Sequence, residues 1–140
     1  MATENLTLLR CFIESVWDRG ELDRLDDFLA PTYVIRHNPG DPWDGQTLDR
    51  KGFAERLRIS RAPFPNQRFR ILESFEDDDK AAIFWAWRGV HDGDLQGFPA
   101  TGKTVFMSGA TTYFFEAGKL SGHWQVADRL SVMKQLSASG

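Results

Sequence analysis

Few side chains in this sequence are both capable of catalysis and placed where the predicted fold would bring them together. Asp128 ends the segment HWQVAD, whose aromatic and β-branched residues predict a strand. Alternate side chains of a strand share a face, so Trp124, Val126 and Asp128 are expected on one side of a sheet. Apolar neighbours raise the pKa of a carboxyl, which suits a group that takes up and returns a proton. The alternative is that Asp128 caps the helical segment RLSVMKQL that follows it.

The three histidines are the other candidates for proton transfer. His37 follows the first predicted strand, His91 ends a later one, and His123 lies on the face opposite to Asp128. Each could donate to an enolate oxygen or hold a water molecule. The alternative is a histidine that satisfies local hydrogen bonds, which is favoured for His123. Their spacing with Asp128 matches no metal motif, so no metal site is predicted.

Length and charge set the class of protein. A chain of 140 residues is the size of one domain, expected to span residues 1–140, and can bury about two thirds of its surface. Its 17 basic and 20 acidic residues give a net charge of −3, which argues against a nucleic-acid partner. The single cysteine, Cys11, forms no internal disulfide, and the N-terminus has no leader pattern. The longest apolar run, residues 81–87, is too short to span a membrane, so the cytoplasm is the expected location.

Hydrophobic spacing predicts helices first and strands afterwards. Apolar residues recur every three or four positions over residues 3–19, 21–29 and 47–60, which indicates three helices. The strands are expected at residues 32–36, 67–76, 80–91, 102–116 and 120–128. Two loops, residues 37–45 and 92–101, separate these elements, and the second is long enough to fold over a site. The arginine-rich stretch 50–70 is interpreted as a solvated surface.

This order predicts an α+β fold, in which helices cover one face of a curved antiparallel sheet. A pocket is expected between the helices and the sheet, and 11 Phe, 5 Trp and 2 Tyr suit an aromatic wall. Strand alternation does not settle which face lines it. The candidate ligand-binding residues are Phe64, Trp85, Trp87, Met107, Thr111, Tyr113, His123 and Trp124.

Four segments in order resemble one family: VWDRGELDRLDDFLAPTYVIRHNPG, FPNQRFRI, GVHDGDLQGFPATGKTV and FFEAGKLSGHWQVADRLSVMKQL. Together they resemble the SnoaL-like polyketide cyclases of the nuclear-transport-factor-2-like superfamily. The resemblance implies a cone-shaped α+β fold enclosing a deep pocket, assembled as a homodimer or a dimer of dimers. It implies ring closure of a bulky polyketide-like or aromatic molecule by intramolecular aldol condensation, without metal or cofactor. Asp128 matches the aspartate that acts as general acid and base in this family, and His37 and His91 are the further catalytic candidates.

The sequence departs from the family pattern at two positions. Thr111 stands where many relatives have histidine, and Gly122 where many have an acidic residue. The missing histidine favours an alternative function, a binding module that holds a hydrophobic small molecule without chemistry. A second alternative is an epoxide hydrolase or isomerase of the same fold. That chemistry needs a second carboxylate, for which the loops offer Asp41, Asp44, Asp92 and Asp94.

Overall fold

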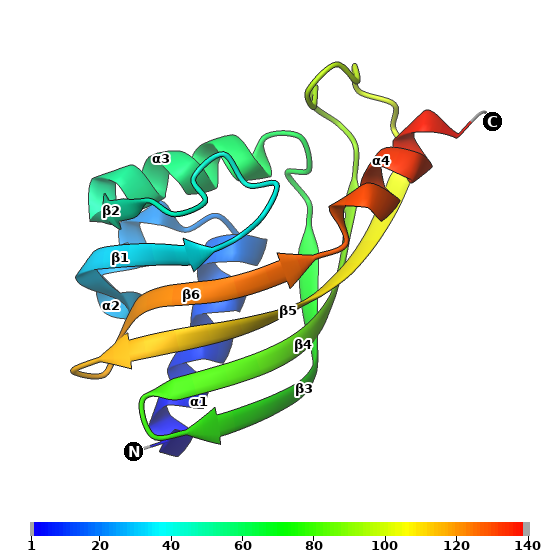
Figure 1. Ribbon diagram of the computed structural model, residues 1–140. Coiled ribbons are helices and arrows are strands. Elements are labelled where there is room, and N and C mark those ends of the chain that lie inside the picture. The colour runs from blue at the N-terminus through cyan, green and yellow to red at the C-terminus, as the bar shows by residue number, and fades with distance from the viewer. Residues whose placement is uncertain (1, 139–140) are drawn as a thin grey trace.

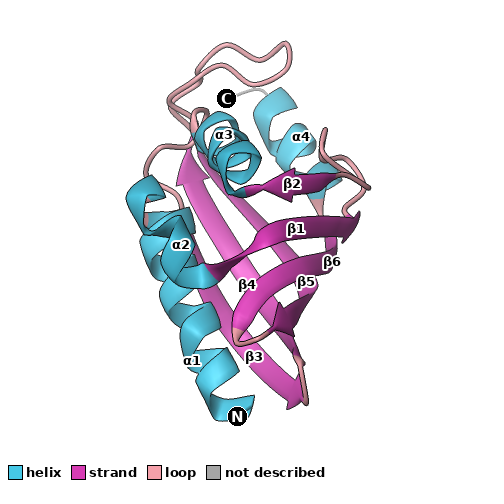
Figure 2. Cartoon of the chain, turned by 90° about the vertical axis from the view of Figure 1, so that its left-hand side faces the viewer, coloured by secondary structure: helices cyan, strands magenta, loops and turns pink. Residues whose placement is uncertain are grey.

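The computed structural model describes residues 2–138 as one curved sheet with helices packed on one side (Figures 1 and 2). The α-helices are α1 (Ala2–Phe12), α2 (Leu25–Phe28), α3 (Arg50–Arg61) and α4 (Arg129–Ser137). The strands are β1 (Leu29–His37), β2 (Thr47–Asp49), β3 (Arg68–Asp77), β4 (Lys80–Val90), β5 (Thr104–Glu116) and β6 (Lys119–Ala127). The face of the sheet toward α1 and α3 is called the inner face below, and the opposite one the outer face. The predicted α+β class is confirmed.

The six strands lie in the order β2-β1-β6-β5-β4-β3, so the sheet is open at β2 and β3. Both predicted hairpins, β3 with β4 and β5 with β6, are antiparallel pairs. The pairing of β1 with β6 is parallel, which differs from the all-antiparallel sheet predicted. No hairpin joins these two strands, so nothing local fixes their relative direction. Register shifts leave one extra residue in β3, Leu72, and one in β6, Ser121, and such bulges bend strands and curve the sheet.

The helices differ from prediction mainly at their ends. The first predicted helix is α1 continued by a π-helical turn (Ile13–Asp18), and Gly20 follows with φ +72°. The second is a 3₁₀ helix (Leu22–Arg24) followed directly by α2, and it ends one residue early because β1 begins at Leu29. The third begins three residues late, since Thr47–Asp49 pairs with the edge of β1 as β2. Asp49 Oδ1 then caps α3 by accepting from the Gly52 N–H at 2.7 Å.

The core lies between the helices and the inner face. Leu9, Phe12 and Val16 from the first helical segment and Leu57 from α3 are fully buried. Aromatic edges join the layers, as where the ring of Phe53 meets that of Tyr33 on β1 at 4.9 Å between centroids. Within residues 2–138 no helix is long and apolar enough to cross a membrane.

Truncation of Leu57 tests this orientation of α3. Leu57→Ala is expected to lower the free energy of unfolding by about 2–5 kcal/mol, because the lost methyl groups leave a cavity in a closed core. Ile59→Ala on the same helix is the control: Ile59 is 44% exposed, and a loss of about 1 kcal/mol or less is expected. Urea denaturation measures both variants. Equal losses would contradict the inward orientation of Leu57.

Candidate functional site

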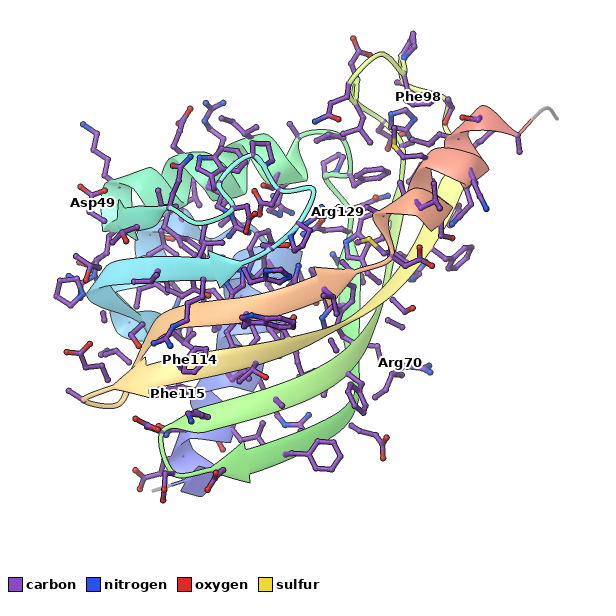
Figure 3. All side chains as sticks on the ribbon, in the orientation of Figure 1. Asp49, Arg70, Phe98, Phe114, Phe115 and Arg129 are labelled. Atoms are coloured by element: carbon purple, nitrogen blue, oxygen red, sulfur yellow. The ribbon has the colours of Figure 1, made fainter. Side chains whose placement is uncertain are left out.

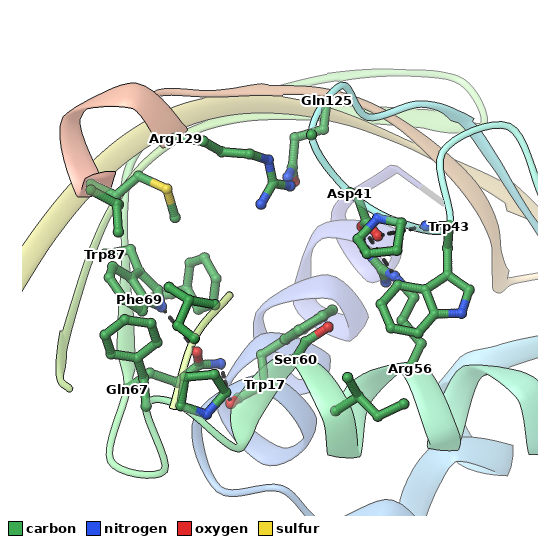
Figure 4. A pocket seen from close by; sticks show the side chains of 18 of the residues that line it. Trp17, Asp41, Trp43, Arg56, Ser60, Gln67, Phe69, Trp87, Gln125 and Arg129 are labelled. Atoms are coloured by element: carbon green, nitrogen blue, oxygen red, sulfur yellow. Dashed lines mark hydrogen bonds and ion pairs between the residues drawn. The ribbon is translucent and has the colours of Figure 1, made fainter. Parts of the chain in front are cut away.

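A cavity of about 700 Å³ lies between the inner face of the sheet, α3 and α4 (Figure 4). Two loops close its mouth: one contributes Asp41 and Trp43, and the other, the loop expected to fold over a site, contributes Asp94 and Leu95. The volume is in the range of sites for organic small molecules. The fold therefore encloses the pocket that the sequence predicted.

The wall on the sheet side is aromatic and held in place by hydrogen bonds. Trp85 Nε1 donates to Thr111 Oγ1 at 2.9 Å, and Trp87 Nε1 donates to Gln67 Oε1 at 3.1 Å. Phe64 packs edge-on to Trp87, with 4.9 Å between ring centroids. Because both indole N–H groups already have hydrogen-bond partners, the two rings are held in fixed positions and their apolar faces line the cavity.

A buried ion pair forms the opposite end of the cavity. Asp41 Oδ2 lies 2.6 Å from Arg56 Nη2, and the two side chains are only 6% and 5% exposed. The same carboxylate accepts from Asn38 Nδ2 at 3.0 Å and, through Oδ1, from the Trp43 N–H at 2.9 Å. Removing one partner of such a pair leaves a buried charge, which costs about 3–5 kcal/mol. The pair therefore fixes the loop of Asp41 against α3.

The amide of Asn38 is oriented by its neighbours. Its Oδ1 accepts from Arg129 Nη2 at 2.9 Å and from Gln125 Nε2 at 3.3 Å. Its Nδ2 faces the Asp41 carboxylate and also lies 3.0 Å from His123 Nε2. An amide nitrogen can only donate, so Nε2 of His123 is the acceptor in this bond.

This assigns the tautomer of His123 and, through it, the direction of the next hydrogen bond. Burial, reinforced by Arg56, lowers the pKa of His123 to about 3, so the ring is neutral at pH 7. The ring proton then sits on Nδ1 and is donated to the Tyr33 oxygen, 2.6 Å away. The Tyr33 hydroxyl keeps its own proton for another acceptor, and Tyr33 lines the cavity.

Two phenols, those of Tyr33 and Tyr113, belong to the lining of the cavity. Burial raises the pKa of Tyr33 well above its usual value, and likewise that of Tyr113. Both hydroxyls stay protonated across the physiological range. Such donors can stabilise negative charge that develops on a carbonyl oxygen of a bound molecule.

Six of the candidate ligand-binding residues line the cavity: Phe64, Trp85, Trp87, Met107, Tyr113 and His123. Thr111 lies behind the wall instead, where it accepts from Trp85 and donates to Gln125 Oε1 at 2.7 Å. The outward face predicted for His123 is wrong, since this side chain is 4% exposed and inside. Polar residues occupy the inner face of β6 because a hydrogen-bond network satisfies them there.

The remaining candidates lie away from the cavity lining. Trp124 is 46% exposed on the outer face of β6 and stacks on His37, with ring centroids 4.3 Å apart. His91 is buried at the end of β4, with Nδ1 2.9 Å from Thr101 Oγ1. Among residues 2–138, no three His, Cys, Asp or Glu side chains come close enough to hold a metal ion.

Asp128 occupies the position that the alternative interpretation describes. It is exposed, and its Oδ1 caps α4 by accepting from the Ser131 N–H at 3.1 Å. Alternation places it with Trp124 and Val126, as predicted, but that face of β6 is the outer one. Its role as acid and base stays a prediction.

Sequence reasoning missed the polar end of the cavity. The stretch 50–70 was assigned to solvent as a whole, whereas Arg56 is buried beside the rings of Trp17 and Phe53. A signal was present, since Arg56 follows Phe53 by three positions and precedes Leu57, which places it on the apolar face of α3. Asn38 and Arg129 carried no comparable signal, because their partners come from distant elements.

Comparison with known proteins identifies the fold and the family together. The sequence model of the SnoaL-like polyketide cyclases matches residues 7–136, and the chain belongs to this family. A candidate polyketide cyclase from Acidithiobacillus ferrooxidans is 43% identical over 97% of this chain and 96% of its own, with a TM-score of 0.92. None of the curated proteins compared with the chain matches it.

More distant structures share the fold. IdmH, a candidate polyketide cyclase from Streptomyces antibioticus, is 24% identical, with 96% of this chain and 99% of IdmH covered and a TM-score of 0.81. AclR, a candidate hydroxylase from Streptomyces galilaeus, is 17% identical, with 97% of this chain and 82% of AclR covered and a TM-score of 0.80. The same cone is therefore found in proteins with different assigned chemistries.

The neutral state of His123 predicts how stability depends on pH. The pKa of His123 is about 3 in the folded chain and near 6.5 when unfolded, so only the unfolded chain takes up this proton between those values. The contribution is full above about pH 6.5 and is lost as the pH falls toward 3. His123→Asn should therefore reduce the fall in unfolding free energy between about pH 7.5 and about pH 5 by roughly 2 kcal/mol.

Urea denaturation at the two pH values measures this difference. His37→Gln on the outer face is the matched control and should keep the wild-type dependence. A wild-type dependence in His123→Asn would mean that the folded chain protonates this ring.

Proposed function

We propose that the chain is a cofactor-independent cyclase that closes a ring in a bulky polyketide-like or aromatic molecule by an aldol reaction. The observation that carries the proposal is the cavity, which is apolar along the sheet and has the protonated phenols of Tyr33 and Tyr113 in its lining. The family to which the chain belongs supports it. An aldol closure removes a proton next to one carbonyl, forms a carbon–carbon bond to a second carbonyl, and returns a proton to the resulting alkoxide.

The hydroxyls of Tyr33 and Tyr113 suit the charged stages of that reaction. Removal of the proton leaves an enolate oxygen, and bond formation leaves an alkoxide oxygen. A phenol that already accepts from His123 has one donor left, so it can point at such an oxygen without reorganisation. A bound molecule that fills the space along the aromatic wall would displace water from it, which strengthens these hydrogen bonds.

Two carboxylates are candidates for the group that carries the proton. The family resemblance assigns this step to Asp128, which would have to reach the cavity from the first turn of α4. Asp41 already lines the cavity, but four hydrogen bonds, two of them from Arg56, already engage its carboxylate. Substitution of each carboxylate separates the two assignments.

One observation favours a second function, a module that binds a hydrophobic molecule without chemistry. Asp128 is exposed and serves as a helix cap, as expected of a chain that uses the same cone only to hold a ligand. The epoxide-opening alternative is less well supported. Of the cavity carboxylates, Asp41 is engaged by Arg56 and Asp94 is exposed, accepting from the Ala100 N–H.

Asp128→Asn tests the assigned acid and base. As a general acid and base, Asp128 would contribute about 10²–10⁴-fold to turnover, and the amide cannot replace it. Asparagine caps helices as well as aspartate, so stability should be kept. The probe is a linear 1,5-diketone with an aromatic end group, whose terminal methyl ketone can close a six-membered ring, and ring closure is followed by absorbance and chromatography. Asp49→Asn, which alters the cap of α3, is the matched control.

The same assay decides between the hypotheses. Loss of turnover in Asp41→Asn alone would move the proton transfer to Asp41 only where the variant still binds the diketone as wild type does, because the same substitution removes the buried ion pair with Arg56. Tyr33→Phe should lower turnover about 10²–10³-fold, as removal of one oxyanion donor does, with little effect on binding. A wild-type chain that binds such diketones but closes none of them would favour the binding module.

We further propose that a second copy of the chain covers the outer face of the sheet. This face is apolar and exposed, with Arg70 projecting beside it (Figure 3). Its large side chains are between 44% and 58% exposed: Phe75, Phe84, Phe106, Trp124 and Val126. A patch of this kind is typical of a protein interface, and the family resemblance implies a homodimer.

Phe106→Glu is expected to convert the dimer to a monomer, because it places a charge on the apolar face. Light scattering coupled to size-exclusion chromatography measures the mass. Ile59→Glu is the control, since Ile59 is also an exposed apolar residue but lies at the cavity. A wild-type chain with the mass of one copy would overturn the proposed dimer.

A further inference from the structure

The polar end of the cavity carries more positive than negative charges. Two guanidinium groups, Arg56 and Arg129, line it together with one inner carboxylate, Asp41. Asp41 is fully occupied: it accepts from Nε and Nη2 of Arg56, from Asn38 and from the Trp43 N–H. His123 between them is neutral, so it neither adds to nor offsets the charge. The inner end therefore holds one positive charge without a counterion.

Arg129 is the group that carries this charge. Among residues 2–138 no carboxylate lies within ion-pair distance of it. Its guanidinium is held by neutral acceptors, with Nε on the Pro39 carbonyl at 3.0 Å and Nη2 on Asn38 Oδ1 at 2.9 Å. These bonds orient the group and leave Nη1 without an acceptor in the described chain. Figure 4 shows Arg129 extending from α4 into the cavity beside Gln125.

Arg56 supplies a second, independent sign that an acceptor is missing. Its Nη1 is buried and has no hydrogen-bond partner among the described residues, although Nε and Nη2 are both engaged. Buried N–H groups are normally satisfied, and an unsatisfied one on a charged side chain is rare. Planar guanidinium groups match carboxylates, whose two oxygens accept in parallel.

We propose that this end of the cavity binds a carboxylate of the substrate, with Arg129 as its main ligand and Arg56 Nη1 as the second donor. The inference rests on the proposed function in assuming that this cavity holds the small molecule. It narrows the substrate to an aromatic or polyketide-like acid. The apolar body then lies along Trp85 and Trp87, and the acid sits at the far end beside the Asn38 amide.

Binding of two isosteric probes tests the inference without requiring turnover. The probes are 2-naphthoate and 2-naphthamide, which differ in charge but not in shape, and isothermal titration calorimetry at low salt and neutral pH gives both Kd values. Wild type should bind the carboxylate at least about tenfold more tightly, because a charge-assisted hydrogen bond is the stronger one. Arg129→Gln should bring the two Kd values together and leave that of the amide unchanged.

Two further variants make the result specific. Arg129→Lys keeps the charge but not the planar fork, so an intermediate preference for the carboxylate is expected. Arg88→Gln removes an exposed arginine from the outer face of β4 and should keep the wild-type preference. Thermal melts confirm that each variant is folded.

The outcomes separate this inference from the proposed function. Equal affinity of wild type for both probes, or a preference that survives Arg129→Gln, would overturn the carboxylate site while leaving the cavity as a site for neutral molecules. Failure of wild type to bind either probe would count against small-molecule binding in this cavity, and the carboxylate site would fall with it.

Discussion

The buried ion pair of Asp41 and Arg56 is the interaction on which the cavity depends. It joins the loop after β1 to α3, two segments that the sheet alone would not hold together. The same carboxylate orients Asn38, and Asn38 in turn fixes His123 and Arg129. A buried pair of this kind adds little net stability compared with apolar residues. Its value here is that one carboxylate orients the Asn38 amide and, through that amide, His123 and one side of Arg129.

The aromatic wall is fixed by a second network that reaches the first. Trp85 donates to Thr111, Thr111 donates to Gln125, and Gln125 donates to Asn38. Wall and polar end are therefore parts of one hydrogen-bonded structure that crosses β4, β5 and β6. Preorganised dipoles of this kind act on a bound molecule without the cost of reorienting. The bulges that curve the sheet make room for a ligand between the wall and α3.

Strand patterns predicted more of this site than polar patterns did. On β4 and β5 alternation groups the residues of each face without settling which face lines the pocket, and the faces with Trp85, Trp87 and Tyr113 do line the cavity. On β6 the same reasoning chose the wrong face. The apolar side chains of Trp124 and Val126 lie on the outer face, and the polar side chains of His123 and Gln125 lie on the inner face. The polar ones are tolerated there because other side chains satisfy their hydrogen bonds, and the outer face is an apolar surface.

The polar end of the cavity could not be predicted from the sequence, for a different reason. Its members come from the loop after β1, from α3, from β6 and from the first turn of α4, so no local spacing links them. The family resemblance supplied the fold and Asp128, but which side of β6 faces the cavity is a property of how the sheet curves around the helices. Arg129, the first residue of α4, is the one that enters the cavity, and not Asp128, the residue before it that caps this helix.

The neutral state of His123 allows only one pattern of hydrogen bonds at the polar end of the cavity. A protonated ring would need acceptors on both nitrogens, whereas Asn38 presents a donor to Nε2. It would also add a third cation beside Arg56 and Arg129, both of which already lower its pKa. Burial and these two cations all lower the pKa of His123, so the ring stays neutral and donates its Nδ1–H hydrogen bond to the Tyr33 oxygen. The Tyr33 hydroxyl is thus kept as a donor toward the cavity by a chain that begins at the Asp41 carboxylate.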